Sequence, residues 1–347
     1  MGMHENIATL SQQHKPVDPK TPHVVTMIEA INMALHRAMN EDPNVVVLGE
    51  DVATNGGVFR ATVGLKDRFG HKRVMDTPLA ETLIAGISVG MAAQKLKPVA
   101  EIQFMGFIYA TMEHIISHAA RMRNRTRGRL TCPMVLRAPY GGGIHAPEHH
   151  SESTEALFAH IPGIRVVIPS SPTRAYGLLL SAIEDPDPVI FLEPKRIYRM
   201  VKQEIYDDGV GLPLDTCYTL RQGEHITLIS WGAMVHETLQ AADKLQQQGI
   251  SAEVIDVATI SPLDLDTLVA SVQKTGRCVI IQEAPRHCGV AAEISASLQE
   301  HAFSSLQAPI ARVTGFDTPM PYLQRENIYM NNVQDIVDTA LKTLEAA

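Results

Sequence analysis

One carboxylate in the segment DTPLAETLIAGISVGMAA, residues 76–93, is the first candidate for chemistry. Thr77 and Pro78 predict a helix start, because proline suits the first helical position. The residues that follow are apolar or small on every face, which indicates a buried helix. Glu81 lies in the first turn, one position too late for a capping box, and the helix dipole would favour it by under about 1 kcal/mol. Because burying a carboxylate costs more than that unless it is paired, we expect Glu81 to be functional.

A glycine-rich histidine loop, YGGGIHAPEHHSES at residues 140–153, is the second candidate. The stretch from His145 to His149 matches the HxxEH pattern of zinc proteases, which requires one continuous helix. Pro147 lies between the two histidines and would break that helix, so the sequence predicts a loop and argues against zinc hydrolysis. Ligands of α/β proteins bind where such loops follow strands, and imidazole is a usual proton shuttle. His150 is the candidate for catalytic contact, with a loop-bracing hydrogen bond as the alternative; neither role is favoured for His145 or His149.

Two expected strand ends supply further candidates. The segment VLGEDV places Glu50 and Asp51 directly after an apolar run, although adjacent acids at a strand end are more often turn residues than catalysts. The segment EIQFMGFIYA carries Phe104 and Phe107. At a spacing of three residues they could pack together in the core, or one of them could lie on a planar cofactor ring.

Short apolar runs rich in β-branched residues alternate with helical patterns along the whole chain. The first expected strands are 45–49, 73–76, 99–104, 134–138, 165–169 and 189–193, with helices at 26–40, 79–96, 110–127 and 172–185. A second series has strands at 226–231, 252–257, 278–283 and 310–314, with helices at 234–248, 264–275, 290–302 and 333–346. Nearly continuous apolar strands separated by helices predict parallel sheets that are covered on both faces.

The fold class is therefore α/β, with two doubly wound sheets. Residues 201–223 are polar and rich in turns, so we expect a first domain over 23–200, a linker there, and a second domain over 224–347. Residues 1–22 lack the apolar block of a secretory signal and the arginines of a mitochondrial presequence. We expect them to be a mobile leader on a cytoplasmic protein.

The composition argues against several classes of partner. The formal net charge is −8 with no long basic run, which disfavours nucleic acid, and no apolar stretch reaches the roughly 20 residues that span a membrane. The cysteines form no CxxC pair, so neither a zinc knuckle nor a redox dithiol is predicted. Neither GxGxxG nor GxxxxGK[ST] occurs, so the chain has no dinucleotide or P-loop fingerprint.

Taken together, these segments resemble the β subunit of the decarboxylating first component of thiamine diphosphate-dependent 2-oxo acid dehydrogenase complexes. The matching stretches are LGEDV, DTPLAE, EIQFMGF, APYGGGIHAPEHHSES, PGIRVVIPSSP, DPVIFLEPKRIYR, WGAMVHETLQAA and KTGRCVIIQEA. The resemblance runs from about residue 24 to the end of the sequence. It implies a thiamine diphosphate pyrimidine-binding-type domain followed by a transketolase C-terminal-like domain.

The resemblance also implies roles for individual residues. Glu81 matches a glutamate that bonds the aminopyrimidine ring nitrogen, and His150 matches a histidine that faces the reacting carbon of the cofactor. The other cofactor contacts that it implies are Glu50, Leu79, Gln103 and Phe107. The residues that match a structural potassium site are Met134, Ala182, Asp185 and Asp187. A plain helix-to-strand turn at 184–188 explains the same residues equally well.

The diphosphate half of the cofactor has no binding segment in this chain. Thiamine diphosphate enzymes carry a GDG segment for magnesium and diphosphate, and no GDG occurs here. Magnesium requires a near-octahedral set of carboxylate and phosphate oxygens. We therefore expect an α subunit to hold the magnesium and diphosphate, in a heterotetramer of two α and two β chains.

Within this family the resemblance is closest to the pyruvate dehydrogenases. It implies decarboxylation of pyruvate and transfer of the acetyl group to the lipoamide of an acyltransferase partner. The alternative is a branched-chain 2-oxo acid dehydrogenase, because HSESTEALFAHIPGIRVVIP resembles both, and an acetoin-type dehydrogenase comes third. A non-catalytic assembly subunit is a further alternative, against which the intact Glu81, Phe107 and His150 argue.

Overall fold

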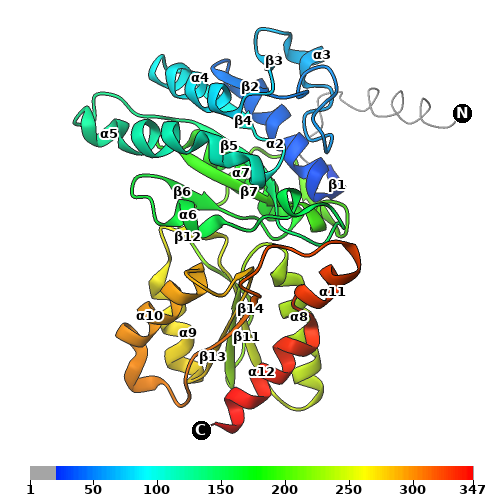
Figure 1. Ribbon diagram of the computed structural model, residues 1–347, viewed down its shortest axis with the longest axis vertical. Coiled ribbons are helices and arrows are strands. Elements are labelled where there is room, and N and C mark those ends of the chain that lie inside the picture. The colour runs from blue at the N-terminus through cyan, green and yellow to red at the C-terminus, as the bar shows by residue number, and fades with distance from the viewer. Residues whose placement is uncertain (1–20, 347) are drawn as a thin grey trace, which may run out of the picture.

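Two α/β domains stacked end to end make up the computed structural model, which describes residues 21–346 (Figure 1). The first contains a seven-stranded sheet in the order β12-β6-β7-β5-β4-β2-β3. Its strands are β2 Val45–Gly49, β3 Val74–Asp76, β4 Lys97–Glu101, β5 Val135–Tyr140, β6 Arg165–Val167, β7 Val189–Pro194 and β12 Thr259–Ser261. Its helices are α2 Met27–Glu41, α3 Leu65–Phe69, α4 Glu81–Ala93, α5 Met122–Arg125, α6 Glu155–Ala159 and α7 Pro172–Glu184.

The second domain contains a five-stranded sheet in the order β14-β13-β10-β11-β9. Its strands are β9 Tyr218–Arg221, β10 Ile226–Ser230, β11 Ala252–Asp256, β13 Cys278–Pro285 and β14 Ala311–Gly315. Its helices are α8 Met234–Gln247, α9 Leu265–Thr275, α10 Val290–Ala302, α11 Glu326–Tyr329 and α12 Val333–Glu345. The fold class predicted from the sequence is confirmed.

The central strands read as continuous apolar runs because both faces of each sheet are covered. Every residue of β2, β5, β7, β10 and β11 is buried. Adjacent strands in the middle of each sheet are parallel, with Val47 of β2 opposite Val99 of β4. Helices α2 and α7 pack against each other over one face of the first sheet. The carboxyl ends of β2, β4, β5 and β7 consequently share one edge, where the chain places its candidate residues.

Three segments differ from the sequence-based expectation. The expected linker contains two strands, because β8 Lys202–Tyr206 pairs antiparallel with β1 Pro22–Thr26, and β9 joins the second sheet antiparallel to β11. Its polar residues suit edge positions, where one side of a strand faces solvent. In addition, β12 from the second half of the chain pairs antiparallel with β6. The two domains therefore share a strand pairing across their boundary.

The helix expected at 110–127 is also not regular. It consists of a 3-10 helix ending at Thr111, a π-helical turn His114–His118, a 3-10 turn Ala119–Arg121 and α5. The π-helical turn seats His114 against α4, because a Cβ added to Gly86 would lie 3.1 Å from its Nε2. A side chain packed that closely favours a local change of helical pitch.

Most of the proposed leader, residues 1–20, lies outside the described part of the chain. Pro22, which was expected to belong to that leader, already begins β1. Within residues 21–346, no helix is both long enough and apolar enough to cross a membrane.

Candidate active site

Two carboxylates meet where β2 ends and α4 begins. Glu50 follows β2 directly and is 7% exposed, and its Oε1 has no hydrogen-bond partner among the described residues. Burial raises the pKa of Glu50, and the negative charges of Glu81 and Asp51 raise it further. Since a buried oxygen without a donor costs about 1–3 kcal/mol, the site is suited to a ligand that brings a hydrogen-bond donor.

The helix that carries Glu81 is buried on one side only. We expected α4 to start near Thr77 and to be buried all round, but its first residue is Glu81, which is half-buried. Leu79 is 82% exposed and Leu83 is 43% exposed. Its buried positions are Ile84, Ala85, Ser88 and Ala92. The prediction that this helix is buried on every face is wrong for the single chain, because the chain supplies apolar neighbours to only one face of α4.

An aromatic wall lies beside the carboxylates. After β4 the chain passes through half-buried Gln103 into a 3-10 helix, Met105–Thr111, that presents Phe107. The ring centroids of Phe104 and His150 are 4.4 Å apart, and those of Phe107 and His150 are 5.3 Å apart. Both pairs meet edge to face. The sequence left open which phenylalanine contacts a ligand, and the structure places both against the same imidazole.

His150 is the histidine of the loop that points into this wall. The loop prediction is confirmed, because only a 3-10 turn, Glu148–His150, forms there. Nδ1 of His150 is buried and has no hydrogen-bond partner within the described chain. Burial lowers the pKa of His150, and the positive charges of His149 and Lys195 lower it further. The imidazole is therefore neutral at physiological pH and is available to accept a proton.

The other two histidines of the loop differ from His150. His149 is exposed. Nδ1 of His145 lies 2.7 Å from Oε2 of Glu326, a residue of the second domain. His145 therefore braces the loop, His149 reaches only the edge of the aromatic wall, with its ring centroid 6.3 Å from that of Phe107, and His150 lies against both phenylalanines.

The sequence did not reveal the buried acidic and basic residues that lie next to the histidine loop. Glu283 in β13 accepts hydrogen bonds from Gly142, and Glu326 in α11 accepts them from Gly143. Lys195 is 4% exposed, and its Nζ has no hydrogen-bond partner among residues 21–346. A glutamate at a strand end, as in VIIQEA, is a signal that could have identified Glu283. No local pattern marks Glu326.

The expected potassium ligands lie around the turn between α7 and β7, where two of them form ion pairs. The carboxylate of Asp187 accepts from Nε of Arg123 at 2.8 and 3.0 Å. The carboxylate of Asp185 lies 3.1 Å from Nη1 of Arg165. Because guanidinium groups already neutralise both carboxylates, a cation there would have to use carbonyl oxygens.

The carbonyls of Met134, just before β5, and of Ala182, in the last turn of α7, differ in what they accept. The carbonyl of Met134 accepts a hydrogen bond from the N–H of Val189 at 2.9 Å. Four residues after Ala182 comes Pro186, which has no N–H, so the carbonyl of Ala182 lacks the usual helical donor. Of the set expected from the sequence, Ala182 therefore offers an oxygen suited to a monovalent cation.

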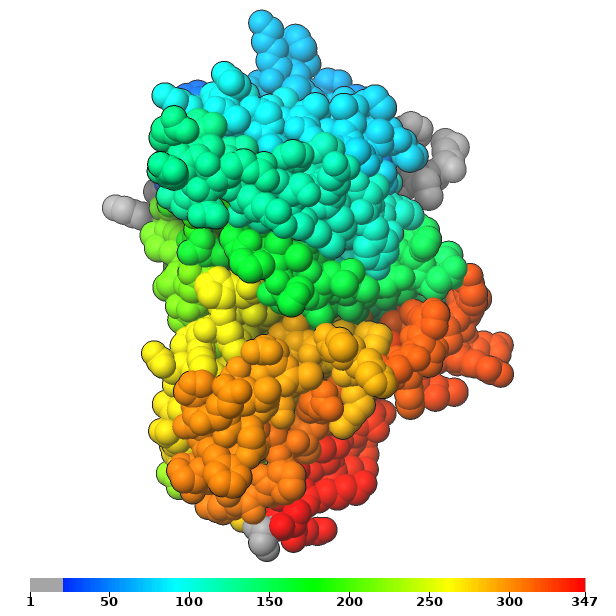
Figure 2. Space-filling model, turned by 60° about the vertical axis from the view of Figure 1, so that its left-hand side comes forward, coloured from blue at the N-terminus to red at the C-terminus, as the bar shows by residue number. Residues whose placement is uncertain are grey.

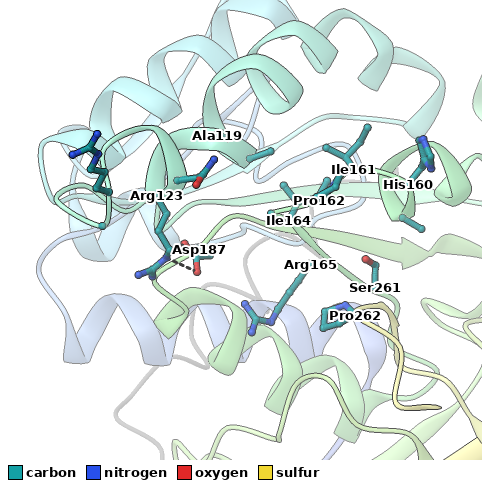
Figure 3. A pocket seen from close by; sticks show the side chains of 16 residues that line it. Ala119, Arg123, His160, Ile161, Pro162, Ile164, Arg165, Asp187, Ser261 and Pro262 are labelled. Atoms are coloured by element: carbon teal, nitrogen blue, oxygen red, sulfur yellow. Dashed lines mark hydrogen bonds and ion pairs between the residues drawn. The ribbon is translucent and has the colours of Figure 1, made fainter.

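A separate pocket of about 770 Å³ lies beside this turn (Figure 3). Arg123 and Asp187 form one wall, and Ser261 with Pro262 lies opposite. None of the residues at the aromatic wall lines it. The pocket is therefore not part of the candidate active site.

Comparison with protein families and curated relatives identifies both domains. Residues 23–201 match the pyrimidine binding domain of transketolase, and residues 215–336 match the transketolase C-terminal domain. The chain is 50% identical over 321 residues to the pyruvate dehydrogenase E1 component subunit beta of Bacillus subtilis, covering 92% of this chain and 99% of that one. It is 48% identical to the subunit of the same name from Acholeplasma laidlawii, covering 93% and 99% of the two chains.

A solved structure agrees at the level of the fold. The chain titled "Split gene transketolase, inactive beta4 tetramer" superposes with a TM-score of 0.76 at 22% identity, covering 93% of this chain and 99% of that one. Both domains match the family models, and the sequence identity to the curated relative is 50% over nearly the full length. The chain belongs to the transketolase-like family of pyruvate dehydrogenase E1 component β subunits.

Proposed function

We propose that the edge formed by Glu50, Glu81, Phe107 and His150 holds the aminopyrimidine half of thiamine diphosphate. The chain itself is the β subunit of the first component of a pyruvate dehydrogenase complex, as its family membership shows. The observation that supports the proposed site is the buried Oε1 of Glu50, which has no donor among the described residues and is close enough to Glu81 for their charges to interact.

The residues at this edge fit an aminopyrimidine. A ring nitrogen and an exocyclic amino group would satisfy Glu81 and Glu50, and the aromatic side chain of Phe107 would cover the ring. Gln103 and the backbone at Leu79 lie on the segments that flank this sheet edge. We propose both as further contacts.

The residues of this chain would hold and move protons around the reacting centre. When bound, thiamine diphosphate supplies a nucleophilic carbon for attack on the 2-oxo acid carbonyl and an electron sink for decarboxylation. Glu81 would hold a proton at the pyrimidine ring nitrogen. His150, kept neutral by its surroundings, would exchange a proton while the acetyl group moves to lipoamide. Phe104 and Phe107 would exclude water from the imidazole.

An α subunit would complete the site. The sequence contains no GDG segment for magnesium and diphosphate, so we propose that a partner chain supplies it across an interface. The exposed Leu83 of α4 and Leu79, two residues before the helix, adjoin Glu81 and would be covered there. We propose a heterotetramer of two α and two β chains, which docks a lipoyl acyltransferase and acts in the cytoplasm.

The decisive test is Glu81→Gln in the reconstituted α–β complex. Glutamine retains the shape of the side chain but cannot hold the proton, so we expect an intact tetramer with decarboxylation reduced by about 10²–10⁴-fold. Carbon dioxide release from pyruvate would be measured with saturating cofactor and magnesium. Turnover at the wild-type rate would contradict the role of Glu81.

The substrate is the second question for the same complex. We propose pyruvate, because the relatives of this chain carry that name over nearly their whole length. Comparing kcat/KM for pyruvate with that for branched 2-oxo acids checks this assignment. A preference for the branched acids would replace it with a branched-chain 2-oxo acid dehydrogenase.

We also propose a potassium ion at the turn between α7 and β7, bound through carbonyl oxygens. The carbonyl of Ala182, which lacks its helical N–H donor, supports this proposal. The carboxylate of Asp187 is less available to the ion, because it is already paired with Arg123. An increase of Tm in potassium chloride over sodium chloride at equal ionic strength would support binding. Equal Tm values would refute it.

A further inference from the structure

Backbone N–H groups of the histidine loop are held by a carboxylate of the second domain. Glu326 begins α11, which lies at the boundary between the two domains (Figure 1). Its Oε1 accepts a hydrogen bond from the N–H of Gly143 at 2.5 Å, and its Oε2 accepts one from the N–H of His145 at 2.9 Å. Its Oε2 also lies 2.7 Å from Nδ1 of His145. Both oxygens of Glu326 are thus used by the loop.

A second carboxylate holds the two ends of the loop together. Oε1 of Glu283 accepts from the N–H of Gly142 at 2.5 Å and from Oγ of Ser153 at 3.0 Å. These two donors lie on opposite sides of His150 in the sequence. Glu283 and Glu326 together therefore fix both the start and the end of the segment that carries the imidazole.

Burial makes these contacts strong. Glu326 is 1% exposed and Glu283 is 8% exposed, so neither carboxylate can replace the loop donors with bulk water. Hydrogen bonds to a charged acceptor are stronger than those between neutral groups. The buried ammonium of Lys195 is attracted by both carboxylates and so offsets part of their charge. The loop is therefore held by electrostatics as well as by packing.

The backbone of the loop is left-handed at Gly143 and His145. Gly143 has φ 83°, and a Cβ added to it would lie 2.1 Å from Cδ of Arg196. His145 has φ 57°, an unfavourable conformation for a residue with a side chain. It persists because Glu326 bonds both its N–H and its ring.

On its other side the loop packs on the first domain. A Cβ added to Gly106 would lie 1.9 Å from the carbonyl oxygen of His149, so the two backbones are in direct contact. The rings of Phe104 and Phe107 then bracket His150. In Figure 2, red-orange residues of the second domain lie against green residues of the first at the boundary between the domains. The loop is clamped between the two domains.

We propose that Glu326 is a positioning residue for His150: it holds the histidine loop from the second domain so that the imidazole faces the reacting centre. The inference rests on the proposed role of His150. It assigns a function in the reaction to a residue of the second domain.

A purely structural role for Glu326 would have different consequences. It would lower stability or assembly, and any loss of activity would follow the amount of intact complex. A positioning role lowers kcat in the intact complex while the KM for pyruvate and the affinity for thiamine diphosphate stay unchanged, because no substrate contact is removed. A misplacement of about 1 Å costs on the order of a hundredfold in rate.

The experiment is a double-mutant cycle of Glu326→Gln with His150→Asn in the reconstituted complex with cofactor and magnesium. Glu326→Gln alone should lower kcat by about tenfold to a hundredfold. If Glu326 acts through His150, the same change should have little further effect in the His150→Asn background. Equal factors in both backgrounds, or wild-type kcat for Glu326→Gln, would overturn the proposal.

A matched control is Glu237→Gln. Glu237 in α8 also bridges the domains, because it lies 2.6 Å from Nη1 of Arg196, but it accepts no hydrogen bond from the loop. The control makes the same charge change at the same boundary and should leave kcat near the wild-type value. A loss as large as that of Glu326→Gln would mean that domain contact alone accounts for the effect, which would overturn the proposal.

Two further variants distinguish a failure of this inference from a failure of the proposed role of His150. If Glu326→Gln does not assemble, Gly143→Ala tests the same claim, because it displaces the loop and keeps the carboxylate. It should show the same non-additive loss of kcat, and wild-type kcat would overturn the inference. Wild-type turnover in His150→Asn would instead overturn the proposed role of His150, and the positioning role with it.

Discussion

Burial gives some side chains of this protein properties that their sequence neighbours do not reveal. Glu155 is 1% exposed. Its Oε1 accepts from Nε1 of Trp231 at 3.1 Å, while its Oε2 has no hydrogen-bond partner in the described structure. Burial raises the pKa of Glu155 to about 7. Burial therefore favours the protonated form of this carboxyl group over the charged form.

This shift predicts a pH dependence of stability. A raised pKa in the folded state means that the folded protein binds the proton more tightly than the unfolded chain. The contribution of Glu155 protonation to the free energy of unfolding is complete below the unfolded pKa of 4.5. It is lost as the pH rises through the folded pKa of about 7. Glu155→Gln keeps the bond to Trp231 and removes the charge. We therefore expect it to raise stability relative to wild type at pH 8 by about 1–3 kcal/mol more than at pH 4.5.

Thermal unfolding of the complete chain at the two pH values measures this difference. Glu293→Gln on the surface of α10 serves as the control, because its charge lies at an exposed position. An identical change in Tm at both pH values for Glu155→Gln would show that the carboxyl group titrates normally.

At the scale of elements, α4 carries more apolar surface than this chain covers. Its sequence has no polar face, yet Leu83 remains exposed, as does Leu79 just before the helix. Apolar surface contributes about 25 cal/mol per Å² when it is buried. A helix with this pattern is typical of an interface rather than of a solvent-facing position. We therefore place the exposed side of α4 within the assembly.

Leu83→Asp tests that placement. A carboxylate at 83 would be buried without a partner in the assembly but solvated in the free chain, so we expect normal folding and reduced association with the α subunit. Size-exclusion chromatography of the co-expressed subunits measures it. Val210→Asp, at a position that is 61% exposed outside the regular elements, is the control. Full assembly of Leu83→Asp would show that α4 stays exposed.

At the scale of the whole molecule, the proposed site is shared, and this chain would supply half of it. It contains the carboxylates and the imidazole that suit an aminopyrimidine, and its sequence has no GDG segment for the charged half of the cofactor. Both domains contribute, because the second holds the histidine loop of the first. Cofactor affinity should therefore depend on the assembly.

We expect the isolated chain to bind thiamine diphosphate at least about tenfold more weakly than the complex with the α subunit and magnesium, a difference of ~1.4 kcal/mol or more. Isothermal titration calorimetry on both samples, with and without magnesium, measures it. Tight binding by the isolated chain would mean that the whole cofactor lies within one protomer.

The sequence alone determined the alternation of strands and helices, the α/β class and the candidates Glu81 and His150. These depend on local patterns: continuous apolar strands, glycine in the loop, and Pro147 interrupting HxxEH. The strands of the expected linker were missed because short polar edge strands carry little periodic signal. The sequence also overstated the burial of α4, since an apolar helix does not reveal which chain covers it.

Only the tertiary structure decided how the histidines divide their roles. Glu326 lies more than 170 residues after the histidine loop, and nothing near it in the sequence points to that loop. The pairing of His145 with Glu326 and the bracketing of His150 by two phenylalanines are contacts between segments distant in sequence. Such contacts depend on how the elements pack, because side chains far apart in the chain meet only after the sheets and domains have assembled.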